Sequence, residues 1–358
     1  MEYFFGNVKK RKQKKRTQRK GIEPISRPST QRRKRRNPVL AVMEQQKQQV
    51  KDTHMNTMVC SPAVMRPGET QMGKRVEGSC YTDKVLLKIR DAYNQGHPNN
   101  RIEESNPPEI WKQLKTRLTG CKKEDCWLKE IKDKNLRKQL DRFVFAPDKP
   151  PEWNKNPNEW LSNYDILGVL EQYEQAYPEF EFIGPTPIDF DAQVRGKCVE
   201  EELCKINVPK LIRAGKRKIG IVFNLDKHNE PGSHWVSLFV DADEQIIFYF
   251  DSANSRIPAQ IHTLIERIQQ QLAKSKKYKY YRNSVSHQQN TTECGVYSLF
   301  FIITMLTKQT EIKQNMGLKE RLDLFMHHRI PDKYIETYRN KYFNGGDSSL
   351  NTVDPQSN

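Results

Sequence analysis

The stretch Cys294–Leu306 is almost wholly hydrophobic, and it limits the possible folds of this chain more than any other feature. A helix that is apolar on every side has to be surrounded by other elements. The run Val296–Leu306 is interrupted by Ser298 and Thr304, and it is too short to cross a bilayer, which takes about 20 apolar residues. We therefore expect a central, buried helix in a globular domain and no membrane span.

Three segments before this helix are rich in Ile, Val and Phe, as β-strands are. They are Ile219–Leu225, Trp235–Asp241 and Gln245–Asp251, with a predicted hairpin turn at residues 242–244. Apolar residues at helical spacing predict amphipathic helices at Trp160–Tyr173 and Ile257–Leu272. This order predicts an α+β domain over residues 150–343, with a central mixed sheet flanked by helices.

The N-terminal part of the chain is strongly basic. Residues 1–40 hold fifteen lysines and arginines against two acids, so this segment supplies most of the net charge of +17. Residues 1–80 lack apolar periodicity, and we expect a disordered basic tail there. Such a tail is suited to non-specific nucleic-acid binding or nuclear import, although a solvated tail that only keeps the protein soluble is the alternative.

Between the tail and the α+β domain, residues 82–145 have helical patterns. Helices are expected after residue 82, at Pro108–Leu118 and at Leu128–Phe145, and together they form a predicted helical arm. Residues 147–158 are rich in proline and predict a linker to the next domain. Residues 344–358 are expected to be a flexible C-terminal tail.

The chain has seven irregularly spaced cysteines, which favours a reducing compartment over a disulfide framework. Cys121 and Cys126 have the spacing of half a zinc site, but no second Cys/His pair lies near them. We therefore interpret them as two ordinary thiols, and no metal site is predicted.

Four polar residues stand out in the α+β domain: His234, Asp251, Gln288 and Cys294. A thiol is a strong nucleophile as a thiolate, which an imidazole beside it favours. The imidazole in turn needs a carboxylate to fix its tautomer, and the oxyanion formed on attack needs a neutral donor such as a glutamine amide. The four residues therefore predict a cysteine hydrolase, with Cys294 at the positive N-terminal end of the apolar helix.

Each of these residues also has an ordinary structural interpretation. A lone cysteine is most often a buried structural residue, a histidine before a strand often belongs to a surface loop, and an acid after a strand often forms a turn. The combination favours catalysis. Among the other histidines, His287 is the one rival for the role of base, because it borders Gln288.

The segments 232–241, 250–254 and 287–297 resemble the ubiquitin-like-protein (SUMO) peptidase superfamily of cysteine proteases. They are most similar to the capsid-polyprotein-processing proteases of large DNA viruses, of the African swine fever virus type. The resemblance covers residues 155–310 well and the helical arm more loosely. It implies a papain-like or SUMO-peptidase-like core within the α+β class.

The resemblance also implies roles for single residues. His234 corresponds to the general base, Asp251 to the residue that orients it, Gln288 to the oxyanion donor and Cys294 to the nucleophile. Some viral relatives have asparagine at the position of Asp251, so this chain resembles the cellular pattern there. In the superfamily, two tryptophans wall a narrow tunnel that admits Gly-Gly, and Trp160 and Trp235 occupy those positions, although both could be plain core aromatics.

The function expected from this resemblance is a viral cysteine endopeptidase that processes capsid or core precursors at Gly-Gly-Xaa sites during virion maturation. No metal or organic cofactor is implied, and the partners are protein substrates with Gly-Gly motifs. The expected location is the virion and the host cytoplasm, at the viral factory, or the nucleus if the tail is an import signal. The alternatives are a deconjugating peptidase for ubiquitin-like proteins, an acyltransferase on a related fold and a non-catalytic nucleic-acid scaffold.

The chain holds one Gly-Gly pair, Gly345-Gly346, in the expected C-terminal tail. Self-processing after Gly346 is one hypothesis for this pair. A helix stop followed by a tail is the simpler interpretation.

Overall fold

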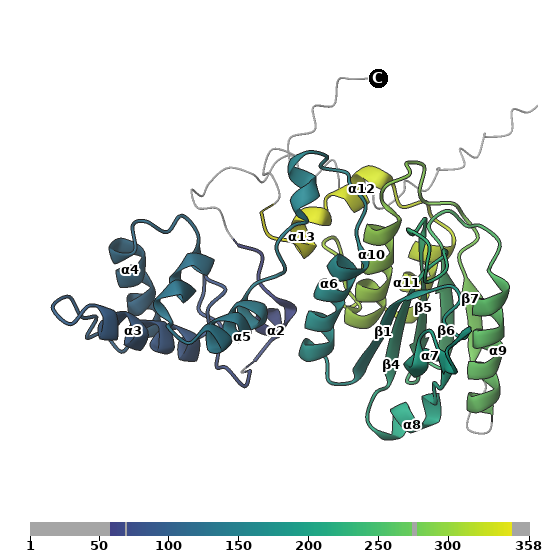
Figure 1. Ribbon diagram of the computed structural model, residues 1–358, viewed down its shortest axis with the longest axis horizontal. Coiled ribbons are helices and arrows are strands. Elements are labelled where there is room, and N and C mark those ends of the chain that lie inside the picture. Colours follow the sequence, from purple (N-terminus) through teal and green to yellow (C-terminus); the bar gives the residue numbers. More distant parts are fainter. Residues whose placement is uncertain (1–57, 69, 274–277, 346–358) are drawn as a thin grey trace, which may run out of the picture. The chain divides into compact units, whose positions relative to one another are not determined.

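The computed structural model describes residues 58–68, 70–273 and 278–345 (Figure 1). Of the predicted tails, residues 1–80 and 344–358, the parts over residues 1–57 and 346–358 lie outside the described residues. The catalytic part of the chain begins after a 3-10 helix, η3, and its elements follow in the order α6, β1 to β3, α7, α8, β4 to β6, α9, β7 and α10 to α13. Their bounds are η3 Pro151–Asn154, α6 Asn163–Ala176, β1 Phe180–Pro187, β2 Gln193–Val194, β3 Lys197–Cys198, α7 Glu201–Cys204, α8 Val208–Arg213, β4 Lys218–Asn224, β5 Trp235–Asp241, β6 Ile246–Phe250, α9 Ala259–Ala273, β7 Lys279–Arg282, α10 Cys294–Thr307, α11 Leu318–Met326, α12 Asp332–Glu336 and α13 Arg339–Tyr342.

Five strands form one mixed sheet in the order β1-β4-β5-β6-β7. The three central strands are antiparallel neighbours, whereas β1 runs parallel to β4 and β7 runs parallel to β6. β2 and β3 make a separate small hairpin. The mixed α+β sheet flanked by helices that the sequence predicts is therefore confirmed.

Alternating side chains of the central strands enter two different cores. On β6, Phe248 and Phe250 pack with α6, α10 and the C-terminal helices, whereas Ile247 and Tyr249 pack on the opposite face with α8 and α9. This alternation follows from the two-residue period of a strand. Figure 1 shows α10 and α9 on opposite sides of the sheet.

Helix α10 is the centre of the larger core. Every residue from Cys294 to Leu306 is buried, and the Phe301 ring stacks on Phe250 with ring centroids 4.7 Å apart. The predicted central, apolar helix is confirmed. The helix packs against β5 and β4, and its first residue belongs to the same core as Trp235 at the start of β5.

The arm has its own hydrophobic core, formed by the helices α3, α4 and α5 and the 3-10 helix η2, whereas α2 packs against α6 and α5. The expected third helix is split, because its first part is the 3-10 helix η2 and only its second part, α5, is α-helical. Helix α6 is hydrogen-bonded to the arm, since the Gln172 amide donates to the carbonyls of Arg142 and Phe145. The arm elements are α2 Pro62–Met65, α3 Asp83–Gly96, α4 Pro107–Arg117, η2 Glu124–Glu130 and α5 Lys134–Val144.

The prediction of a disordered tail up to residue 80 is wrong for residues 58–80. This segment contains α2, and it is fixed by long-range contacts that have no local sequence pattern. The Asn344 side chain accepts from the Val59 N–H at 2.6 Å and donates to the Val59 and Ala146 carbonyls. Asn344 is therefore anchored rather than part of a loose tail.

The cysteine prediction is also wrong. Six of the seven cysteines form three disulfides, and only Cys294 is free. Spacing alone does not reveal which cysteines meet in the fold, so the irregular pattern was uninformative. The pairs are Cys60–Cys80, Cys121–Cys126 and Cys198–Cys204.

Two further observations concern the sequence predictions. Within the described ranges, no helix combines the length and the hydrophobicity that a membrane span requires.

Gly345 has a φ of +82°, in the region that favours glycine, so this residue has a backbone reason to be glycine that is independent of any cleavage. The self-processing hypothesis itself lies outside the described residues, which stop before Gly346.

Candidate active site

Cys294 is the first residue of α10 and is 1% exposed. The Glu293 carbonyl accepts the N–H of Tyr297, which closes the first turn of the helix. The backbone N–H groups at this end have no partner within the helix, and together with the helix dipole they favour a negative charge. The local fold therefore puts a thiol where a thiolate is stabilised.

His234 is the residue immediately before β5. Its carbonyl accepts the Leu225 N–H at 2.9 Å, which continues the pairing of β4 and β5 past the strand end. Its imidazole Nε2 lies 2.7 Å from Asp251 Oδ1, and the Cys294 thiol is near enough to contribute to the pKa of the ring. Because Nε2 is occupied by the carboxylate, Nδ1 is the nitrogen available to the thiol.

Asp251 follows β6 directly and is almost fully buried. Its carboxylate accepts two backbone N–H bonds besides the imidazole, from Ala253 at 2.9 Å and from Ser255 at 2.8 Å. Burial raises the pKa of this carboxyl, but the hydrogen bond and charge of His234 and the two N–H donors outweigh it, so the pKa lies below its usual range. Asp251 is therefore a fixed negative charge beside the imidazole.

The pKa of His234 is raised to about 10. Burial alone lowers it, but the hydrogen bonds to Asp251 and Cys294 and the charges of both groups have the larger, opposite effect. The protonated ring is thus favoured at neutral pH.

The Gln288 amide is held in one orientation. Its Oε1 accepts the Ser252 hydroxyl at 2.7 Å, and its Nε2 donates to the Asn290 carbonyl at 2.6 Å. A flipped amide would put two oxygens against each other at Asn290, so this pair of contacts fixes which end is the donor. The NH₂ group carries two protons, and one of them remains for an oxyanion.

Sequence reasoning missed two residues that support this arrangement. Asn283 is buried and makes two bonds with the Asp251 backbone, accepting from its N–H at 3.1 Å and donating to its carbonyl at 2.7 Å. Ser252 orients Gln288 through its hydroxyl and also accepts the Gln288 N–H on its carbonyl. The available signal was positional, because Asn283 directly follows β7 and Ser252 comes two residues after the end of β6.

His287, the rival base, is fully buried and has both ring nitrogens engaged. Nε2 donates to the Phe325 carbonyl at 2.9 Å, and Nδ1 accepts the Ile330 N–H at 3.1 Å. Burial is the main cause that lowers its pKa to about 4. His287 is therefore a neutral structural histidine, and its nitrogens are not free to act on the thiol.

The two tryptophans lie at one cavity of about 790 Å³ next to this site. Trp160 is 37% exposed, whereas Trp235 is buried and its indole N–H donates to the Leu161 carbonyl at 3.0 Å. Gly295 allows this packing, because a Cβ there would lie 3.0 Å from Leu161 Cβ and 3.3 Å from Trp235 Cδ1. Gly295 therefore has a packing reason to be glycine.

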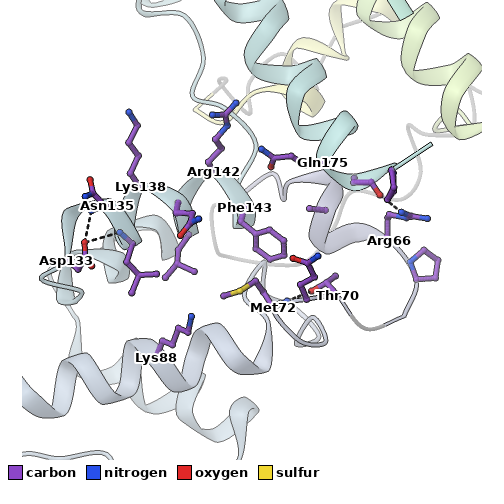
Figure 2. Close-up of a pocket in the computed structure, with 18 residues that line it drawn as sticks. Arg66, Thr70, Met72, Lys88, Asp133, Asn135, Lys138, Arg142, Phe143 and Gln175 are labelled. Atoms are coloured by element: carbon purple, nitrogen blue, oxygen red, sulfur yellow. Dashed lines mark hydrogen bonds between the residues drawn. The ribbon is translucent and has the colours of Figure 1, made fainter. Parts of the chain in front are cut away.

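A larger cavity of about 1280 Å³ lies elsewhere, between the arm and the C-terminal end of α6 (Figure 2). Figure 2 shows four basic side chains around it, those of Arg66, Lys88, Lys138 and Arg142. None of the described residues that line it is a cysteine or a histidine. The larger volume therefore does not mark the chemistry, which belongs to the thiol–imidazole–carboxylate set.

A search for metal ligands among the described residues finds no group of three or more His, Cys, Asp or Glu side chains that could hold an ion. The chemistry that this geometry supports is nucleophilic attack by a thiolate with an imidazole as proton carrier.

Comparisons with known proteins agree with this chemistry. Residues 216–344, which include all four polar residues, match the model of the Ulp1 protease family, C-terminal catalytic domain. A thiol protease of Acanthamoeba polyphaga mimivirus is 34% identical over 277 residues, which are 74% of this chain and 83% of that protein. A cysteine protease of African swine fever virus is 29% identical over 209 residues, which are 52% of this chain and 74% of the viral protein.

The crystal structure of the African swine fever virus protease aligns with a TM-score of 0.54 and 21% sequence identity. The alignment covers 81% of this chain and 97% of that structure, so the two chains share a fold that includes regions outside the family match. The chain is a cysteine protease and belongs to the Ulp1 protease family.

Proposed function

We propose that this protease processes viral structural precursor proteins at Gly-Gly-Xaa sites, after the second glycine, during virion maturation. The observation that carries the catalytic part is one imidazole that is hydrogen-bonded to Asp251 and whose pKa is raised by the Cys294 thiol at the start of a buried helix. The resemblance to viral capsid-processing proteases and the mimivirus and African swine fever virus relatives support the viral substrate class.

The proposed reaction has two steps. The Cys294 thiolate attacks the scissile carbonyl, and the His234 imidazolium gives its proton to the leaving amine, which leaves a thioester and a neutral imidazole. A water then gives its proton to the imidazole as its oxygen attacks the thioester, and the acid product and the thiolate–imidazolium pair result. The Gln288 NH₂ and the Cys294 backbone N–H stabilise the oxyanion in both steps.

The proposed selectivity for Gly-Gly is steric. Trp160 and Trp235 line the cavity beside the catalytic pair, and two indoles that approach the substrate backbone would exclude side chains at the two residues before the cut. Glycine is the only residue that lacks a Cβ, so it alone would pass.

Cleavage of fluorogenic peptides tests the proposal. We expect turnover of a Gly-Gly-Ala peptide, little turnover of an Ala-Ala-Ala peptide, and no turnover of either by Cys294→Ser. Trp160→Ala should raise the relative rate for Ala-Ala-Ala if the indole excludes side chains. Equal cleavage of both peptides by the native enzyme would contradict the proposal that the indoles exclude side chains. Turnover by Cys294→Ser would contradict the assignment of Cys294 as the nucleophile.

A second candidate is a deconjugating peptidase for ubiquitin-like proteins. It is favoured by the African swine fever virus relatives that are named SUMO-1 cysteine proteases and are 29% identical to this chain. A folded ubiquitin-like protein with a C-terminal Gly-Gly-Xaa extension is the discriminating substrate. Efficient cleavage of that protein together with poor cleavage of short Gly-Gly peptides would favour the deconjugase.

We further propose that the basic residues 1–40 hold the enzyme near nucleic acid in the virion and the viral factory. Fifteen cationic side chains on one segment would bind a polyanion with strong salt dependence. The test compares DNA binding of the full chain with a chain that lacks residues 1–57, at several salt concentrations. We expect the shortened chain to bind DNA more weakly and with less dependence on salt. Equal binding by the two chains would show that the tail does not contribute to DNA binding.

A further inference from the structure

The residue that precedes the proposed nucleophile in the sequence belongs to a buried ion pair. Glu293 precedes Cys294 as the N-cap residue of α10, and its side chain is 0% exposed. Arg339, the first residue of α13, is 2% exposed and donates from Nε to Oε2 at 3.0 Å and from Nη2 to Oε1 at 2.8 Å. This is the two-pronged geometry in which a guanidinium binds a carboxylate most strongly.

The same guanidinium also holds the segment that precedes Trp160. Its Nη1 donates to the Glu159 carbonyl at 2.8 Å, and its plane lies 4.5 Å from the centre of the Trp153 ring. The Trp153 indole N–H donates to the same Glu159 carbonyl at 3.1 Å. One buried side chain therefore connects the residue before the nucleophile with the residue before a wall of the substrate cavity.

The charge of Glu293 acts on its surroundings. It contributes, after burial, to the raised pKa of Glu336 on α12, and it is a smaller cause of the raised pKa of Tyr297 on α10. An unpaired buried carboxylate next to Cys294 would act on the thiol in the same way, because a like charge opposes ionisation. The groups that favour the thiolate are His234 before β5 and, through it, Asp251 after β6.

We propose that Arg339 is a positioning residue that neutralises Glu293, sustains the Cys294 thiolate and fixes the Trp160 segment relative to the nucleophile. This inference rests on the proposed function, because it assumes that Cys294 is the nucleophile. A purely mechanical anchor would make the same hydrogen bonds but would have no effect on the ionisation of the thiol.

Thiol alkylation separates these two roles. Cys294 is the only unpaired cysteine of the seven, so the rate of reaction of the folded enzyme with iodoacetamide reports on one thiol. The rate is proportional to the thiolate fraction, and its pH profile gives a midpoint without any substrate. We would measure this profile for the full chain and for variants that keep or remove each charge.

Arg339→Gln leaves a buried carboxylate unpaired beside the thiol. We expect the alkylation midpoint to move to higher pH by about one unit or more, as close like charges cause elsewhere. At pH values below the native midpoint, kcat for the Gly-Gly peptide should fall about tenfold, with a smaller change in KM, because there a shift of one pH unit is a tenfold change in thiolate fraction. The double variant Glu293→Gln with Arg339→Gln removes both charges and should bring the midpoint back toward that of the native enzyme.

A second ion pair in the same chain, with a buried arginine and a partly buried glutamate, is the matched control. Arg321 on α11 is 0% exposed, and its Nη2 donates to both carboxylate oxygens of Glu244 at 2.6 Å. Glu244 lies in the turn between β5 and β6. Arg321→Gln should lower the melting temperature but leave the alkylation midpoint unchanged. If Arg339→Gln does not fold, the double variant and Arg339→Lys, which keeps the charge, carry the comparison.

Identical midpoints for Arg339→Gln, the double variant and the native enzyme would overturn the inference. A midpoint shift of equal size in the single and double variants would also overturn it, because the cause would then be structural. Failure of the proposed function is a different result: Cys294→Ser would retain turnover. Loss of turnover in Cys294→Ser together with a native profile in Arg339→Gln would refute this inference alone.

Discussion

The properties of single side chains are set by their partners more than by their residue type. His234 and His287 have the same side chain and are both partly or fully buried, but the pKa of one is raised to about 10 and that of the other is lowered to about 4. The first has a buried carboxylate beside it, and the second has neutral backbone partners. This difference identifies one proton carrier and one structural histidine.

Asp251→Asn tests the charge beside His234. The variant keeps the size of the side chain but removes the charge that raises the pKa of His234, so that pKa should fall. The alkaline limb of the kcat/KM profile, where the imidazolium loses its proton, should therefore move to lower pH. We expect kcat to fall on the order of 100-fold or more, as in other catalytic triads. An unchanged alkaline limb would show that the charge of Asp251 does not raise the pKa of His234.

His287 predicts a loss of stability in acid. Between pH 6.5 and about 4 the unfolded chain binds a proton on this histidine that the folded chain does not, so the free energy of unfolding falls as pH drops through this window. The full effect is about 3 kcal/mol. Urea unfolding of His287→Gln at pH 8 and pH 4.5 should show a smaller drop than the native enzyme, and parallel drops would contradict this assignment.

Among the helices and strands, those with uniform hydrophobic patterns were predictable. The segments predicted as the three central strands agree with β4, β5 and β6 to within one residue at each end. β1 was missed because Gly184-Pro185 interrupts it, and β7 because its sequence Lys279–Arg282 is polar. Both are edge strands that pair in parallel with distant segments, which local patterns do not reveal.

The candidate site was predictable only where the chemistry marks a residue. The nucleophile, base and acid have distinctive types in distinctive contexts, so sequence reasoning could name them together. The supporting residues are of ordinary polar types: Asn283, Ser252 and Arg339. Each acts through a hydrogen bond to a segment that is distant in the sequence, from 32 residues away for Asn283 to 180 residues away for Arg339. No sequence signal specified those contacts.

The close packing of α10 against the segment before α6 predicts an effect of Gly295→Ala. The new Cβ would lie 3.0 Å from Leu161 Cβ, so Leu161 and Trp235 must shift. A shift of the cavity wall should lower kcat/KM, while alanine raises helix propensity by about 1 kcal/mol and offsets part of the packing cost. Peptide cleavage and the melting temperature, measured together, separate the two effects.

Gly168→Ala on α6 is the control for this substitution. A Cβ at that position meets only Pro147, at 3.6 Å or more, which is ordinary contact. It should raise the melting temperature and leave kcat/KM unchanged. Native activity of Gly295→Ala would show that the cavity wall tolerates the displacement.

Over the whole molecule, long-range links join the arm to the catalytic part. Asn344 hydrogen-bonds Val59 across 285 positions of the sequence, and Gln172 hydrogen-bonds the end of α5. The Cys60–Cys80 disulfide links the segment before α2 to the residues that directly precede α3 of the arm. These links explain why the folded region starts earlier than hydrophobic periodicity indicated.

The Cys60–Cys80 disulfide predicts a measurable contribution to stability. It closes a loop with a sequence separation of 20, which corresponds to about 3 kcal/mol when the unfolded chain is constrained. Substitution of both cysteines by alanine should lower the free energy of unfolding by that amount, and the urea midpoint should fall with it. A variant with the same midpoint as the native protein would show that the bond does not form in solution.

The most direct test of the central claim is covalent labelling of the full chain by a Gly-Gly peptide with a thiol-reactive group in place of the scissile bond. Intact-mass measurement and peptide mapping give the number and position of adducts. We predict one adduct, on Cys294, formed faster than with the Ala-Ala analogue and absent in Cys294→Ser. Labelling of a different residue, or equal rates with the two peptides, would contradict a Gly-Gly-selective thiolate at the start of α10.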